Sequence, residues 1–113
     1  MKNDISILAK YLVKEDLTMF EIELLRYLLK REDLLKELWK ASIKEANEYN
    51  KANDLETIKV YFNDFVGKYV FDYMREHTKG KEATELIEHA LCDVRFWKIN
   101  DIIIETFNLK GGD

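Results

Sequence analysis

The residues best suited to binding a metal ion are a histidine and a cysteine in the C-terminal half. His89 and Cys92 lie three residues apart, which places them on one side of a helix, and Glu85 precedes His89 by four residues. A structural zinc site normally takes four ligands in two closely spaced pairs, and here no second pair is present. We therefore expect no metal ion and no cofactor, with Cys92 a small buried apolar residue and His89 at or near the surface.

Catalytic chemistry finds little support in the sequence. No glycine-rich phosphate loop is present, and neither Ser6 nor Ser42 lies in a nucleophile motif. Glu82, Glu85 and Glu88 form an acidic run, but an amphipathic helix places such residues in water by default. We expect the protein not to be an enzyme.

A series of lysines is the strongest candidate for contact with an anionic partner. They fall within an arc of about 80° on one side of a predicted helix, and they are Lys36, Lys40, Lys44 and Lys51. Like charges at four-residue spacing oppose the helix by a few tenths of a kcal/mol per pair. A solvated face and a face that meets phosphates both remain open, and the second predicts binding that weakens steeply with salt.

An aromatic and an aliphatic residue lie between this lysine arc and the apolar side of the same helix. Trp39 and Ile43 there are typical of the edge of a core, and a tryptophan at a rim is also typical of a binding hot spot. The sequence does not separate the two interpretations.

Length and composition define the scaffold that positions these residues. The chain has 113 residues, of which 47% are hydrophobic and 35% charged, with no proline, so it can form one domain over residues 1–113 with a real core. The net charge of −4 argues against a domain that coats nucleic acid. Ten basic and ten acidic residues precede position 53, against eight basic and twelve acidic after it. Any nucleic-acid face should therefore be N-terminal.

The expected location is the cytoplasm. Cys92 is the only cysteine, and no basic region followed by an apolar stretch opens the chain. The longest clean apolar run covers residues 102–104, far short of the roughly 20 residues that span a bilayer. Glu and Lys together make 27 of the 113 residues, a bias found in hyperthermophile proteins and also produced by an AT-rich genome.

Helix signals in the N-terminal half are clear. Asn3 or Asp4 can cap a first helix that ends near residues 14–16. Thr18 and Glu21 form a capping box that predicts a second helix starting at Met19. Apolar residues then follow a three-and-four spacing to about residue 51, which predicts either one long kinked helix or two consecutive helices, the second capped by Asp33.

The C-terminal half continues in the same way until its last segment. Asn53 is the expected cap of a helix over Leu55 to His77, closed near Gly80, and another helix begins near Lys81. Residues 94–107 favour a helix, with a short two-stranded hairpin turning at Asn100 and Asp101 as the alternative. The fold class is therefore an all-α, compact antiparallel bundle of four to five helices.

The helix over Leu55 to His77 carries apolar residues on two faces. One broad face includes Ile58 and Phe62, and on nearly the opposite side lies a second set, Val60, Gly67, Phe71 and Met74. This is either the central helix of the monomer or a helix whose second face forms a homodimer or partner seam, where Gly67 lets another helix approach closely.

From these features we expect a small helical interaction protein, either a homo-oligomer or an accessory subunit of a larger assembly. The expected partner is a second copy or another protein, with no membrane and no small-molecule substrate. The alternative is a nucleic-acid-associated regulator that uses the N-terminal lysine face.

Overall fold

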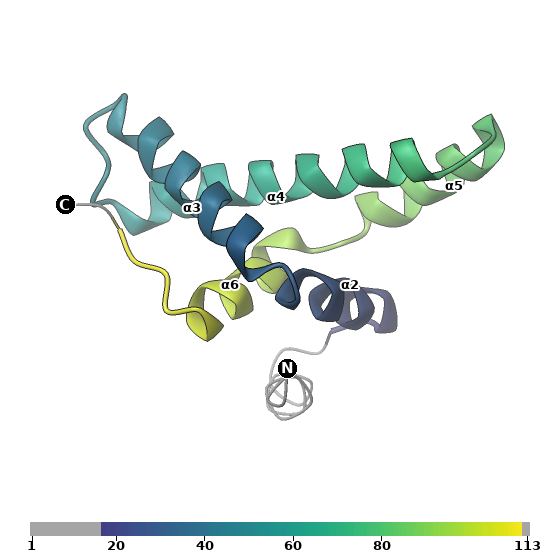
Figure 1. Ribbon diagram of the computed structural model, residues 1–113, viewed down its shortest axis with the longest axis horizontal. Helices are drawn as coiled ribbons and strands as arrows, with labels where there is room; N and C mark the ends of the chain where they lie inside the picture. The colour runs from purple at the N-terminus through teal and green to yellow at the C-terminus, as the bar shows by residue number, and fades with distance from the viewer. Residues whose placement is uncertain (1–16, 112–113) are drawn as a thin grey trace.

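The structure is a computed structural model that describes residues 17–111, and within that range every regular element is a helix. The elements are α2 (Met19–Leu29), α3 (Glu32–Asn47), α4 (Leu55–His77), α5 (Lys81–Cys92) and α6 (Phe96–Thr106). They form a flattened all-α globule measuring 44 × 33 × 22 Å (Figure 1). The predicted fold class is confirmed, while the first helix predicted from Asn3 or Asp4 lies outside the described residues.

Helix α2 begins where its capping box predicts. The Glu21 backbone N–H donates to Thr18 Oγ1 at 3.1 Å, and the Thr18 N–H donates to Glu21 Oε1 at 2.9 Å. The long apolar pattern that follows forms two helices, separated at residues 30–31. The N-cap of α3 is Arg31, so the prediction that Asp33 caps this helix is wrong; Asp33 lies in the first turn, where its charge complements the helix dipole.

The ends of α4 differ by small shifts from the sequence-based expectation. Its bounds, Leu55–His77, are those predicted, but its N-cap is Asp54 rather than Asn53. Its C-cap is Thr78, and Gly80 is the N-cap of α5 with φ 93°. Gly80 therefore allows the turn into α5 instead of closing α4, because only glycine adopts this conformation without strain.

Shortly after the last residue of α3 and of α6, an asparagine takes the left-handed conformation. Asn50 after α3 has φ 59° and Asn108 after α6 has φ 53°. At each end the following residue closes a Schellman motif: the Lys51 N–H donates to the Ala46 carbonyl and the Leu109 N–H donates to the Ile104 carbonyl, both at 2.9 Å. These turns redirect the chain without glycine or proline.

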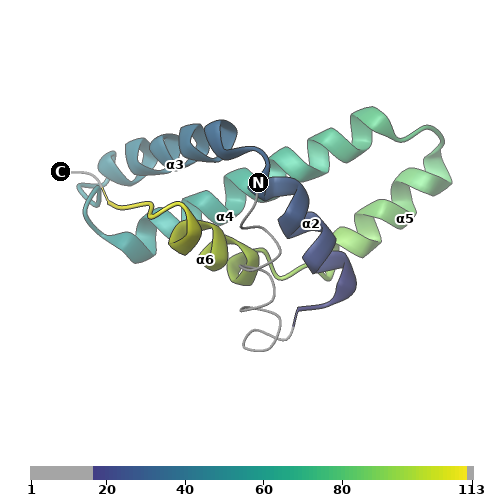
Figure 2. The same ribbon diagram turned by 60° about the horizontal axis from the view of Figure 1, so that its bottom comes forward.

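Helix α4 is the central element. Helix α3 packs along one side of it, α6 along another, and α5 folds back on its C-terminal part (Figures 1 and 2). Its side chains Ile58, Phe62 and Val66 are fully buried. Trp39 of α3 meets Phe62 edge to face, with ring centroids 5.1 Å apart, which locks the α3–α4 contact.

The segment after residue 94 is a helix, so the hairpin alternative is excluded. Ile99, Ile102 and Ile103 of α6 are buried at helical spacing. Asn100, also buried, donates from Nδ2 to Asn63 Oδ1 of α4 at 2.8 Å, and its own Oδ1 has no hydrogen-bond partner in residues 17–111. This polar pair fixes how α6 sits against α4.

A buried ion pair joins α2 to the start of α6. The Glu21 side chain is 1% exposed, and its carboxylate accepts from the Arg95 backbone N–H at 2.8 Å, from Nε at 3.0 Å and from Nη2 at 2.5 Å. The hydrogen bonds from Arg95 lower the pKa of Glu21 to about 2, against the opposing effect of burial.

No helix within residues 17–111 is both long and apolar enough to cross a membrane.

Candidate functional site

Helices α2 and α4 diverge, and their side chains line a pocket between them. Their Cα atoms all lie more than 8 Å apart, and the gap is bridged by the rings of Tyr27 and Tyr73, whose centroids are 5.7 Å apart. The pocket has a volume of about 170 Å³ and a nearly wholly apolar lining, formed by Phe20, Glu23, Leu24, Tyr27, Tyr73 and Met74. Phe20 of this lining is 40% exposed, and Met19, which precedes it at the start of α2, is 73% exposed. Large apolar groups thus remain uncovered where two helices separate.

An arginine lies at one end of this pocket. The Arg31 guanidinium carbon sits 4.0 Å from the centroid of the Tyr27 ring, a cation–π arrangement. Tyr69 stands beside Tyr73 with ring centroids 6.3 Å apart, and burial raises the pKa of the Tyr69 phenol. No ion pair involves Arg31 within residues 17–111, so the neighbour of its guanidinium there is an aromatic ring and not a carboxylate.

Aromatic rings recur every fourth residue along α4 and lead toward the pocket. They are Tyr61, Phe65, Tyr69, Tyr73 and His77. His77 stacks on Tyr73 with ring centroids 4.0 Å apart, and its Nδ1 lies 2.8 Å from the Tyr73 carbonyl oxygen. The broad apolar face that the sequence predicts for this helix, with Ile58 and Phe62, also includes Phe65, Tyr69 and Tyr73. The four-residue period was the available signal that they form a separate row.

The residues of the predicted seam on α4 do not share one environment. Val60 is 59% exposed. A Cβ placed on Gly67 would lie 4.0 Å from Phe96 Cδ2, so α6 of the same chain covers this position. Phe71 and Met74 are partly buried against the core, and Met74 also lines the α2–α4 pocket. The second apolar face is therefore largely used within the monomer, apart from Val60.

The predicted lysine face is shorter than expected. Lys36 Nζ lies 2.6 Å from Glu32 Oε2, and Lys40 Nζ lies 3.5 Å from Glu37 Oε1. Lys44 is exposed on the same helix. Lys51 is not part of the arc, because α3 ends at Asn47 and the left-handed turn at Asn50 takes the chain out of the helical path.

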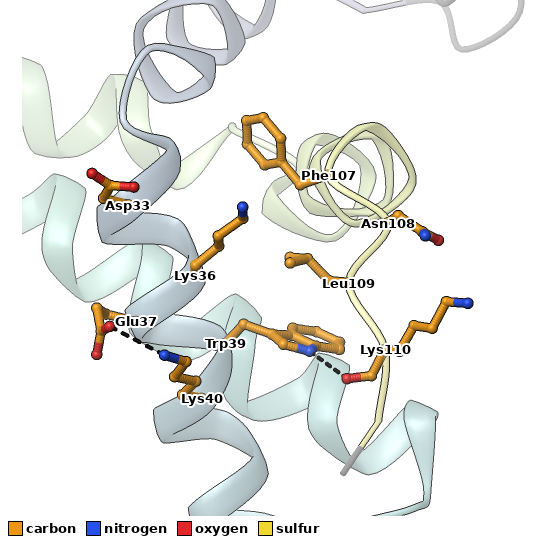
Figure 3. Close-up of a pocket in the computed structure, with 9 residues that line it drawn as sticks. All are labelled: Asp33, Lys36, Glu37, Trp39, Lys40, Phe107, Asn108, Leu109 and Lys110. Atoms are coloured by element: carbon orange, nitrogen blue, oxygen red, sulfur yellow. Dashed lines mark hydrogen bonds and ion pairs between the residues drawn. The ribbon is translucent and has the colours of Figure 1, made fainter.

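A wider groove lies between α3 and the segment that follows α6 (Figure 3). Its volume is about 420 Å³, and its lining residues are Asp33, Lys36, Glu37, Trp39, Lys40, Phe107, Asn108, Leu109 and Lys110. Trp39 is only 4% exposed, and its indole N–H donates to the Lys110 carbonyl oxygen at 2.7 Å. A Cβ on Gly111 would lie 3.4 Å from the Ala52 carbonyl oxygen. The segment after α6 is thus held against α3 and the loop that follows it, and the Trp39 N–H already has a hydrogen-bond acceptor within the chain. Ile43 is partly buried against the core.

The His89 and Cys92 pair lies in a shallow pocket of about 190 Å³ that is also lined by Glu85 and Glu88. Cys92 is exposed, so the expectation that it is buried is wrong. Helix α5 packs on the core through Leu91, and the next residue, Cys92, lies on the solvent side of the helix. Glu88 Oε2 lies 3.0 Å from Arg75 Nη2. Within residues 17–111, no three His, Cys, Asp or Glu side chains are grouped closely enough to hold a metal ion.

Comparison with models of known protein families, with curated proteins and with solved structures finds no match to this chain. The pocket between α2 and α4 therefore has to be interpreted from its own chemistry.

Proposed function

We propose that this domain is a non-enzymatic interaction module that binds a protein partner in the pocket between α2 and α4. The supporting observation is the pocket itself, where Phe20, Tyr27 and Met74 present aromatic and thioether surface at a gap that the fold leaves open. Interfaces concentrate their binding energy in such sites, with aromatic and methionine side chains enriched at their cores.

The groove on α3 is a weaker candidate for the same role. Trp39 is nearly buried and already uses its only donor on Lys110, while Lys36 and Lys40 have carboxylate neighbours. A partner there would have to replace interactions that the monomer already makes. The α2–α4 pocket instead presents apolar surface that a partner can cover, and within residues 17–111 its only ion-paired lining residue is Glu23.

Site-specific photocrosslinking tests the proposal. Benzoylphenylalanine replaces Met19, the neighbour of Phe20 in the lining, or, as the matched control, Val60 on α4; both positions are exposed. In cells that make the protein, we expect crosslinked protein adducts from position 19 that disappear when Phe20→Glu is added, and fewer adducts from position 60. Absence of adducts at position 19, or adducts that survive Phe20→Glu, would contradict the proposal.

A further inference from the structure

The outward face of α5 carries an exposed leucine among acidic residues. Leu86 is 72% exposed, although leucine is among the residues that folding most readily buries. Glu82, four residues earlier, lies on the same side of the helix, and Glu85 borders it. Both glutamates are exposed, and neither forms an ion pair within residues 17–111.

The small residues around Leu86 leave the leucine prominent. Ala83 and Ala90 lie three residues before and four residues after it, so they share its side of α5, and both are exposed. A neighbouring helix can approach closely over alanine, with Leu86 as the projecting group. The face therefore has the form of an apolar anchor with carboxylates beside it.

The pocket between α2 and α4 has the complementary chemistry. It offers an apolar cavity for an aliphatic side chain. Lys30 and Arg31 follow the last turn of α2, and no carboxylate within residues 17–111 pairs with either. Glu23, the one acidic residue of the lining, is already 3.3 Å from Arg26 Nη1. Arg31, over the Tyr27 ring of the lining, and the adjacent Lys30 therefore have no anionic partner among residues 17–111.

We propose that the occupant of the pocket is α5 of a second copy of this chain, with Leu86 inserted between α2 and α4 and Glu82 and Glu85 facing Lys30 and Arg31. This inference rests on the proposed function, for which it names the partner. Opposite charges on the two faces favour this pairing and its register.

The arrangement of the helices suits a reciprocal contact. Helices α2 and α5 lie toward the same end of the molecule, away from the loop that joins α3 to α4 (Figures 1 and 2). In a two-fold dimer, a contact from α5 of one protomer to the pocket of its partner occurs twice. The dimer therefore contains this contact twice, and it covers both the exposed Leu86 and the apolar α2–α4 pocket of each protomer.

Leu86→Glu tests the anchor. Because Leu86 is exposed, we expect the variant to keep its circular dichroism spectrum and melting temperature while its dimer dissociation constant rises by at least about tenfold. Sedimentation equilibrium measures the constant. Val60→Glu, the same change at another exposed position, should leave it unchanged. A wild-type protein that is monomeric at every accessible concentration, or a Leu86→Glu variant that still dimerises normally, would overturn the inference, as would dissociation by Val60→Glu.

A charge exchange tests the pairing. One variant carries Lys30→Glu with Arg31→Glu, and the other carries Glu82→Lys with Glu85→Lys. Each variant alone should be monomeric, because its pocket and its α5 then have like charges. An equimolar mixture should form a heterodimer, because both contacts regain opposite charges, and native mass spectrometry distinguishes it from either homodimer. A mixture that stays monomeric while both variants are folded contradicts the pairing.

The two levels of the proposal fail differently. A monomeric wild type whose position 19 still crosslinks to another protein removes the second copy as partner and keeps the interaction module. Loss of all crosslinks at position 19 removes the module itself.

Discussion

At the residue scale, the carboxylate of Glu21 links a local signal to a distant one. Its role in the capping box could be predicted, because Thr18 lies three residues away. Its partner Arg95 could not, because 74 residues separate the two and nothing in the local pattern marks either of them. Burial of this carboxylate is tolerated because Arg95 and the Thr18 N–H satisfy both oxygens.

The pKa of Glu21 predicts an acid-sensitive contribution to stability. The pKa falls from its ordinary value of 4.5 in the unfolded chain to about 2 in the folded protein, a difference worth about 3 kcal/mol. This stabilisation is fully present above pH 4.5 and is lost as the pH falls through about 2. Glu21→Gln keeps a capping oxygen and removes the charge, so we expect an unfolding free energy lower by about 3 kcal/mol at pH 7.

Urea unfolding of Glu21→Gln and wild type between pH 7 and pH 2 measures this difference. The two unfolding free energies should converge toward pH 2. Thr18→Ala, which removes only the cap, should cost about 1 kcal/mol with no such convergence. If the unfolding free energies of Glu21→Gln and wild type differ by the same amount at every pH, the proposed role of the charge is contradicted.

The buried amide of Asn100 leads to a second prediction at this scale. Its Oδ1 is buried without a partner in the described chain, a situation that costs free energy. Asn100→Leu removes this unpartnered oxygen but also the hydrogen bond to Asn63 Oδ1, so the unfolding free energy should change by no more than about 1 kcal/mol. Asn100→Asp should lower it by about 3 kcal/mol at pH 7, since it adds an unpaired buried charge. Chemical unfolding checks both, and a stable Asn100→Asp variant would show that the site is hydrated.

At the element scale, helix positions were more predictable than helix ends. The bounds of α4 follow from apolar spacing and flanking polar residues, and α6 follows from the three-and-four spacing of Ile99, Ile102 and Ile103, which outweighs the β propensity of isoleucine. The end of α3 at Asn47, four residues before the expected end, was not predicted because the turn residue is Asn50. Asparagine enters the left-handed region at moderate cost but is equally common in ordinary loops.

Those two asparagines define a testable difference. Asn108→Gly should keep or slightly raise the melting temperature, because glycine adopts φ 53° without strain. Asn108→Ala should lower the unfolding free energy by about 1 kcal/mol, because a Cβ without a compensating polar group disfavours this conformation. Thermal unfolding ranks the three proteins, and equal stability of the alanine and glycine variants would contradict the strain argument.

At the scale of the whole molecule, the sequence predicts faces but not the angles at which helices cross. Leu24, Tyr27 and Tyr73 are apolar positions on their own helices, yet whether they close a core or line a pocket depends on the separation of α2 from α4. The central position of α4 was one of two interpretations that its two apolar faces allowed. The packing of Phe96 over Gly67 uses part of that second face inside the monomer.

The packing also predicts unequal local stability. Leu91 is the one fully buried residue of α5, whereas α4 buries Ile58, Phe62, Val66 and Val70. We expect the amides of α5 to exchange with solvent by local opening, faster than those of the first half of α4. Hydrogen exchange read by mass spectrometry measures this difference in a dilute, monomeric sample. Equal protection of the two helices there would contradict it.

The hydrogen bond from the Trp39 indole to the Lys110 carbonyl has a consequence for biosynthesis. The indole of Trp39 and the carboxylate of Glu21 are both made early, and their partners lie 71 and 74 residues further along the chain. While the ribosome is still adding α4 and α5, the Glu21 carboxylate lacks its donor Arg95 and the Trp39 indole N–H lacks the Lys110 carbonyl. These two contacts therefore form late in folding, because each needs a residue more than 70 positions further along to have left the ribosome.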